Sequence, residues 1–208
     1  MTEDEAKADL AARVSRETLD RLELYAALLA KWQTTINLVS PNTLPLIWSR
    51  HMLDSAQLMD YAPQAAKTWL DLGSGGGFPG LVCAAIAAGT HPALKVNLVE
   101  ADLRKAAFLR ETARQMGLSV GVFSRRIEDL PPQTADVISA RALAPLPALC
   151  AHAARHLATA GVALFQKGAR HADELELARQ GWQMDVTIIP SVTDAEAVLF
   201  RIERLTHA

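Results

Sequence analysis

Four glycines stand within the five residues from Gly73 to Gly77, and they are the strongest chemical signal in the sequence. The apolar run 68–72 before them predicts a strand, and the residues after them predict a helix. A glycine turn between a strand and a helix lets the backbone approach a ligand closely at the carboxyl end of a parallel sheet. We therefore expect a nucleotide-type site at this turn.

One spacing of these glycines is typical of dinucleotide sites. Gly75, Gly77 and Gly80 fit the pattern G-x-G-x-x-G, and Glu100 follows twenty residues after Gly80. In a dinucleotide site such a carboxylate binds the ribose hydroxyls, and the phosphates face the first turn of the helix. This spacing leaves a nicotinamide cofactor, and hence an NAD-dependent reductase, open.

A second spacing favours S-adenosylmethionine. The pattern G-x-G-x-G occurs two residues after an acidic side chain, in Asp71, Gly73, Gly75 and Gly77. At the expected helix start, Pro79 has no N–H to offer a pyrophosphate, and Phe78 places a bulky ring there. Both residues suit a cofactor without phosphates better, and Glu100 can accept hydrogen bonds from the ribose hydroxyls of either cofactor.

The elements that must position this turn form an alternating pattern. The expected strands are 68–72, 94–99, 120–123, 135–139 and 162–165. The expected helices are 78–88, 102–116, 146–158 and 171–180. The alternation of strands and helices predicts parallel strands with right-handed crossovers. The strand-like runs 182–189 and 197–205 have no helix between them, so they predict an antiparallel hairpin at one edge of the sheet. The fold class is therefore α/β, with a seven-stranded, mostly parallel sheet.

The residues before this pattern are helical. Apolar residues recur at helical spacing after Ser15, at Leu19, Leu22, Ala26, Leu29 and Trp32. A second helix is expected after Thr43, with Pro45 in its first turn. We predict a helical appendage over residues 1–66 and one compact domain over residues 67–208.

Composition restricts the class of protein. Half of the residues are hydrophobic and 21% are charged, which excludes a disordered or collagen-like chain. The net charge of −2 would argue against a polyanionic partner, but residues 101–170 carry ten basic and five acidic side chains. A local anion-binding face is therefore compatible with a near-neutral chain. No apolar run is long enough to span a bilayer, and we expect a cytoplasmic monomer without a metal site.

Several motifs together resemble one family. They are NLVS, RHMLDS, DLGSGGGFPG, LVEADLRKAAFL, ISARALAPL and LFQKG, in that order. From about Leu19 to the end, the chain is similar to the bacterial glucose-inhibited division protein B family, also called the ribosomal RNA small subunit methyltransferase G family. The resemblance implies a class I methyltransferase with a Rossmann-like fold, which moves a methyl group from S-adenosylmethionine to N7 of a guanine in the 530 loop of 16S rRNA. Its partner would be this RNA or the small ribosomal subunit.

The resemblance also implies roles for individual residues. Donor binding is expected at Gly73, Phe78, Ile127, Glu128 and Arg141, beside the glycine turn and the carboxylates Asp71 and Glu100. Catalytic positioning is expected from Arg141, Lys167 and His51, and RNA contact from Arg50, Arg126, Arg141 and Lys167. No general base is expected, because N7 of guanine carries a free lone pair.

Two points stay open. The same residues would suit a non-catalytic RNA-binding assembly factor that retains a donor pocket. His51 either bonds Asp54 and braces the helical appendage, or contacts the substrate.

Overall fold

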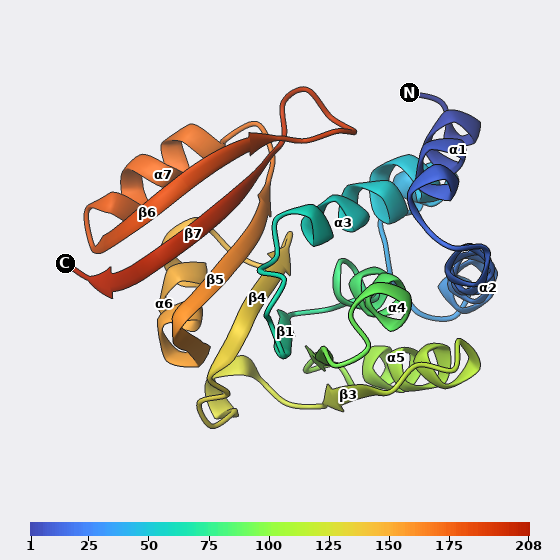
Figure 1. Cartoon of the computed structure of the whole chain (residues 1–208), viewed down its shortest axis with the longest axis horizontal. Coiled ribbons are helices and arrows are strands. Elements are labelled where there is room, and N and C mark those ends of the chain that lie inside the picture. Colours follow the sequence, from blue (N-terminus) through green and yellow to red (C-terminus); the bar gives the residue numbers. More distant parts are fainter.

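The protein is described by a computed structural model that covers residues 1–208. Its seven-stranded sheet has the order β3-β2-β1-β4-β5-β7-β6, and Figure 1 shows it with helices on both faces. The strands are β1 (Thr68–Leu72), β2 (Lys95–Val99), β3 (Val120–Phe123), β4 (Ala135–Arg141), β5 (Leu157–Lys167), β6 (Trp182–Pro190) and β7 (Val198–His207). β1 to β5 pair in parallel, and β7 is antiparallel to both β5 and β6. The predicted sheet is thus confirmed.

Alternate residues of each strand belong to two separate cores. On one face Trp69, Leu98 and Val137 join a core with α4 (Gly80–Thr90) and α5 (Leu103–Gln115). On the other face a second core includes α6 (Leu146–His156) and α7 (His171–Arg179). Because successive side chains of a strand point to opposite faces, the continuous apolar runs in the sequence follow from burial on both sides.

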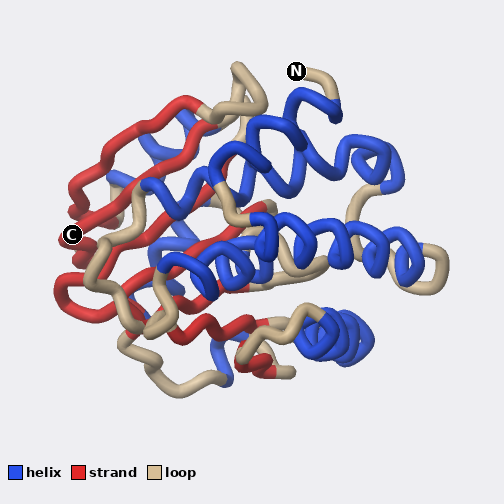
Figure 2. Tube along the Cα trace, turned by 45° about the vertical axis from the view of Figure 1, so that its right-hand side comes forward, coloured by secondary structure: helices blue, strands red, loops and turns tan.

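The N-terminal helices pack on the face that carries α4. They are α1 (Glu3–Arg13) and α2 (Arg16–Gln33), and Figure 2 shows them on the same side of the strands as α4. Leu22, Tyr25 and Leu29 of α2 lie in one core with Phe78 and with Trp69 of β1. The apolar stripe that the sequence shows on this helix is therefore buried against the sheet domain.

The irregular segment 41–60 differs from the single helix expected after Thr43. It consists of a 3-10 turn (Pro41–Leu46), a π turn (Ile47–Leu53), the short α3 (Asp54–Ala56) and another 3-10 turn (Gln57–Asp60). Pro45 lacks an N–H, so the segment around it cannot continue a regular α-helical ladder. π turns are rare and occur often at functional sites.

Other boundaries shift by a few residues. α4 begins at Gly80 instead of residue 78, and α6 ends at His156, where β5 follows directly at Leu157. α1 was not predicted, although Thr2 and Glu5 form a capping box at its start. No helix combines the length and the apolar character needed to cross a bilayer.

Candidate functional site

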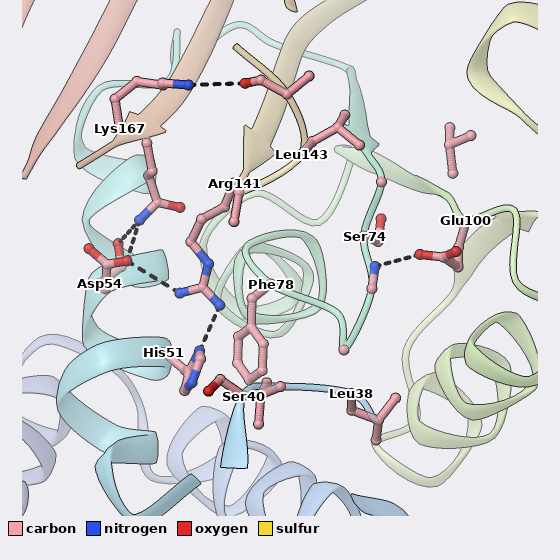
Figure 3. Close-up of a pocket in the computed structure, with 18 of the residues that line it drawn as sticks. Leu38, Ser40, His51, Asp54, Ser74, Phe78, Glu100, Arg141, Leu143 and Lys167 are labelled. Carbon is pink, nitrogen blue, oxygen red and sulfur yellow. Dashed lines mark hydrogen bonds and ion pairs between the residues drawn. The ribbon is translucent and has the colours of Figure 1, made fainter. Parts of the chain in front are cut away.

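A cavity of about 960 Å³ lies at the carboxyl ends of the parallel strands. Its lining includes the glycine turn after β1, Glu100 after β2, Arg141 at the end of β4 and Lys167 at the end of β5. β1 lies between β2 and β4, so the crossovers leave it in opposite directions. This switch in strand order is where an open α/β sheet forms its ligand crevice. Figure 3 shows the side chains that converge on the cavity.

The glycine turn has a shape that other residues would not adopt without strain. Gly73, Gly75 and Gly77 have φ values of +61°, +54° and +98°. A Cβ on Gly73 would lie 2.5 Å from a methyl group of Leu143, and one on Gly77 would lie 2.5 Å from the Tyr25 hydroxyl oxygen. The turn therefore presents backbone without side chains to the cavity. On its other side it packs against Tyr25 of α2.

Glu100 fastens the turn to the end of β2. Its Oε2 accepts a hydrogen bond of 2.8 Å from the Gly75 N–H, and its Oε1 accepts one of 2.8 Å from the Asp102 N–H. Each carboxylate oxygen has a second lone pair, so both oxygens can still accept a hydrogen bond from a ligand. A bare glycine backbone beside a carboxylate with spare acceptors fits the aminoacyl and ribose parts of S-adenosylmethionine.

Asp71 supports the turn from beneath and does not line the cavity. It is fully buried, and its Oδ1 accepts a hydrogen bond of 2.6 Å from Ser139. Burial raises the pKa of the Asp71 carboxyl from its usual value to about 6. Gly80 packs against it so closely that an added Cβ would lie 2.7 Å from Asp71 Oδ2. Asp71 therefore acts on any ligand through the backbone.

Arg141 is the centre of the polar side of the site. Its Nη2 donates to His51 Nδ1 at 2.7 Å, and its Nη1 donates to the Arg50 carbonyl at 2.9 Å and to Asp54 Oδ2 at 3.3 Å. Its guanidinium carbon lies 5.0 Å from the centre of the Phe78 ring. Figure 3 shows Arg141 between His51 and Asp54, with Phe78 beside it. Four groups on two separate segments therefore fix one side chain.

His51 is held as a neutral imidazole. Burial, together with the positive charges of Arg141 and Arg50, lowers its pKa to about 3. Because Arg141 donates to Nδ1, the ring proton resides on Nε2, which donates to Thr43 Oγ1 at 3.0 Å. His51 bonds these two groups and not Asp54, so the pairing with Asp54 was wrong. Its ring also lies 4.8 Å from that of Phe78.

Lys167 is already paired. Its Nζ lies 2.5 Å from Glu174 Oε2 and donates to the Ala144 carbonyl at 3.0 Å, as Figure 3 shows for the second contact. Only 9% of its side chain is exposed. Glu174 also accepts from the Leu146 N–H, so this ion pair joins α6, α7 and β5. In this arrangement Lys167 orders the 142–146 turn at the edge of the cavity.

The remaining predicted residues lie around the mouth of the cavity. Ile127 is buried and Glu128 is exposed, on a 3-10 turn (Ile127–Asp129) after β3. The Arg126 side chain is 76% exposed and 3.7 Å from Glu128. Arg50 is half exposed and lies 2.6 Å from Asp194 in the loop between β6 and β7. Ile127 and Glu128 thus form an apolar and acidic wall of the cavity. Arg50 and Arg126 form a basic rim at the same opening.

Sequence reasoning missed several residues of the site. Tyr25 has the helical spacing of a core residue, but its hydroxyl donates to the Gly76 carbonyl and its ring stacks on Phe78 at 5.0 Å. Leu38 lines the cavity from a loop, and Gln166 donates to Asp54 Oδ2 at 2.6 Å. A polar group within an apolar helical stripe is the one signal in the sequence that could have identified Tyr25.

No three His, Cys, Asp or Glu side chains lie close enough together to hold a metal ion. His156 bonds the Ile127 carbonyl at 3.3 Å and His152 lies 3.8 Å from Glu128, so these two histidines have protein partners.

Comparison with known proteins gives a consistent result. The family model described as rRNA small subunit methyltransferase G matches residues 18–200. Ribosomal RNA small subunit methyltransferase G of Jannaschia sp. (strain CCS1) is 57% identical, over 97% of this chain and 95% of its own length. The protein of that name from Cereibacter sphaeroides (strain ATCC 17025 / ATH 2.4.3) is 54% identical over the full length of both.

Among solved structures, M. jannaschii TYW2 in complex with AdoMet has a TM-score of 0.55 at 13% identity, covering 78% of each chain. The pyocyanin biosynthetic protein PhzM has a TM-score of 0.61 at 11% identity, covering 85% of this chain and 61% of that one. These likenesses concern the fold.

Proposed function

Because the chain belongs to the rRNA small subunit methyltransferase G family, we propose that it transfers a methyl group from S-adenosylmethionine to N7 of a guanine in the 530 loop of 16S rRNA. The observation that carries this proposal is the cavity where the bare glycine turn, Glu100 and Arg141 converge at the carboxyl edge of the sheet. The atom and the loop come from the family resemblance, and the cavity supplies the place for the reaction.

The residues that would hold S-adenosylmethionine come from three loops. The turn from Gly73 to Gly77 would take the aminoacyl part, and Glu100 would accept from the ribose hydroxyls. Ile127 and Glu128 lie farther along the same opening, where a buried aliphatic side chain and an acceptor suit the face and the amino group of adenine. Phe78 lies between the turn and Arg141 and would border the end of the site that holds the methyl group.

When bound, S-adenosylmethionine supplies a methyl group whose bond to sulfur breaks, leaving the electron pair on sulfur, as the N7 lone pair forms the new bond to carbon. N7 bears no proton, so the chain has no proton to remove. Both ring nitrogens of His51 are bonded, and no free base is required of it. The protein's contribution is to align the guanine and exclude water, which supplies up to about 7–11 kcal/mol in well-oriented reactions.

Arg141 is the residue we assign to this alignment. A guanidinium beside the cavity can donate to O6 of guanine and leave N7 free for attack, because O6 and N7 are separate acceptors on the same base edge. Arg50 and Arg126 lie on the rim, where phosphates of a folded RNA would pass. Lys167 contributes by ordering the adjoining turn, and it reaches RNA only when its ion pair with Glu174 opens.

The test is transfer of labelled methyl groups to purified 16S rRNA and to small ribosomal subunits, with the modified base located by mass spectrometry. We expect incorporation at one guanine N7. Arg141→Ala should lower the rate about 100-fold, since misplacement of a reacting group costs that much. Arg179→Ala, on the outer end of α7, is the matched control and should behave as the wild type. Binding of the RNA without any transfer would instead favour the assembly-factor alternative.

We also propose that the protein works as a monomer in the cytoplasm. Every residue assigned above comes from one chain, and ribosomal RNA is a cytoplasmic substrate in bacteria. Light scattering on the active protein tests the first statement, and fractionation of cells with detection of the protein tests the second.

A further inference from the structure

The carboxylate of Asp54 is the most connected side chain outside the residues assigned above. It lies at the start of α3 and touches four other segments. Its Oδ2 accepts from Arg141 Nη1 at 3.3 Å and from Gln166 Nε2 at 2.6 Å. Its Oδ1 accepts from Gln57 at 2.8 Å and from the Ser191 and Thr193 hydroxyls at 3.3 Å each. All five contacts are donors.

The partners on Oδ2 favour a charged carboxylate. Burial raises the pKa of Asp54 and the charge of Arg141 lowers it, and a proton on Oδ2 would face the N–H donors of Arg141 and Gln166, which cannot accept it. Only 15% of the Asp54 side chain and 17% of the Arg141 side chain are exposed. With His51 neutral, Asp54 is the only anionic group bonded to the Arg141 guanidinium.

We propose that Asp54 is a positioning residue for methyl transfer, which holds the Arg141 guanidinium against Phe78 and balances its charge. The inference rests on the proposed function. During transfer, positive charge appears on the guanine ring, and an unbalanced guanidinium beside that ring would oppose it. Asp54 lies on the far side of Arg141 from Phe78, so it can compensate the charge without touching the base (Figure 3).

The geometry also explains why the carboxylate that bonds Arg141 comes from the N-terminal part of the chain. Arg141 is the last residue of β4, and the groups that bond its guanidinium come from residues 50–54. Asp54 follows the π turn that carries Arg50 and His51, and both of these also bond Arg141. One short segment therefore supplies three of the groups that orient this side chain.

A double-mutant cycle tests the proposal. The cycle compares the wild type with Asp54→Asn, Arg141→Gln and the double variant in single-turnover methyl transfer to 16S rRNA. The melting temperature of each protein is measured as well, together with its affinity for S-adenosylhomocysteine, the product that S-adenosylmethionine leaves after transfer. We expect Asp54→Asn to slow transfer about 10- to 100-fold with S-adenosylhomocysteine affinity unchanged. In the Arg141→Gln background the same substitution should change the rate less than about 3-fold, because it then has nothing to position.

A purely structural role gives a different result, since the two losses would multiply in the double variant and overturn the proposal. A wild-type rate for Asp54→Asn would also overturn it. Ser191→Ala removes one contact on Oδ1 and the bonds of Ser191 to Thr193, but it leaves both contacts on Oδ2 in place. Ser191 does not line the cavity, and its substitution should leave the rate unchanged. A slow Ser191→Ala variant would mean that loop anchoring, and not Arg141, is what Asp54 provides.

A further variant decides the matter if Asp54→Asn does not fold. Arg141→Lys keeps the charge but cannot bond Asp54, His51 and the Arg50 carbonyl at once. Transfer as slow as in Arg141→Gln supports positioning, and a rate near the wild type overturns it. Failure of the proposed function is separate, because it would appear as absence of transfer by the wild-type protein.

Discussion

Gly77 illustrates how a single residue shapes the donor site. It has φ +98°, and a Cβ would lie 2.5 Å from the Tyr25 hydroxyl oxygen and 2.6 Å from a methyl group of Leu81. We expect Gly77→Ala to lower the free energy of unfolding by about 1–3 kcal/mol, because it combines overpacking with an unfavourable backbone conformation. It should also weaken S-adenosylhomocysteine binding. Urea unfolding and calorimetry measure the two effects.

The matched control is Gly181→Ala, because no atom lies within 4 Å of an added Cβ at that position. It should change neither stability nor binding. Equal behaviour of the two alanine variants would show that the turn tolerates a side chain and is not shaped by the contacts with α2.

His51 predicts a pH dependence of stability. Its pKa is about 3 in the folded chain and ordinarily 6.5, so below pH 6.5 the unfolded chain takes up a proton that the folded chain does not. The contribution of neutral His51 to the free energy of unfolding is fully present above pH 6.5. It is lost as the pH falls toward 3, by at most about 1.4 kcal/mol per pH unit. His51→Asn keeps an acceptor for Arg141 but removes this titration. Urea unfolding of both proteins at pH 7.5, 6 and 5 should therefore give a shrinking difference, and parallel curves would contradict the expectation.

The sequence predicted which residues gather at the site better than what each one bonds. Arg141 and Lys167 were placed at the sheet edge because they follow parallel strands, and both line the cavity. That Lys167 is paired with Glu174 depends on how α7 packs, which no local pattern encodes. The assigned roles of these residues remain predictions until the variants are measured.

At the scale of elements, the loop after α2 forms a wall of the donor cavity and depends on one side chain. Gln33, the last residue of α2, accepts from the Leu38 and Val39 N–H groups through Oε1 and donates to the Val39 carbonyl at 2.7 Å. Leu38 and Val39 both line the cavity. Gln33→Ala should loosen this wall and weaken S-adenosylhomocysteine binding about 3- to 10-fold, since a typical hydrogen bond contributes about 0.5–1.5 kcal/mol.

The control for Gln33→Ala is Gln115→Ala. Gln115 bonds only Glu111, within α5 and away from the cavity. Calorimetry should show unchanged affinity for this variant. A Gln33→Ala protein with wild-type affinity would mean that the packing of Leu38 against Gly76 holds the loop without the amide.

Regular elements were predictable where one face or both faces are apolar throughout. The strands and α4 to α7 meet that condition, and their order was confirmed. α1 was missed because only Ala6 and Leu10 of its residues are buried, which is too few for a visible stripe. The segment 41–60 bends because its groups must reach Arg141 and the β6–β7 loop, so tertiary contacts override local propensity.

At the scale of the whole molecule, the net charge of the middle of the chain differs in sign from that of the two ends. Residues 101–170 have an excess of five positive charges, although the chain as a whole carries −2. Lys105, Arg125 and Arg126 of this part line the cavity and lie on its rim. A modest local patch on a near-neutral protein favours one structured RNA site over indiscriminate binding.

The salt dependence of RNA binding follows from this arrangement. Each phosphate contact releases condensed counterions, so the affinity for 16S rRNA should fall steeply with salt while S-adenosylhomocysteine affinity changes little. Arg126→Ala should lower the slope of log affinity against log salt by about 1. Arg204→Ala changes the net charge equally but removes an arginine of β7 that pairs with Asp185 and lies outside the cavity. Fluorescence titrations should therefore give Arg204→Ala the wild-type slope, and equal slopes for both variants would mean that total charge, not the rim, governs RNA binding.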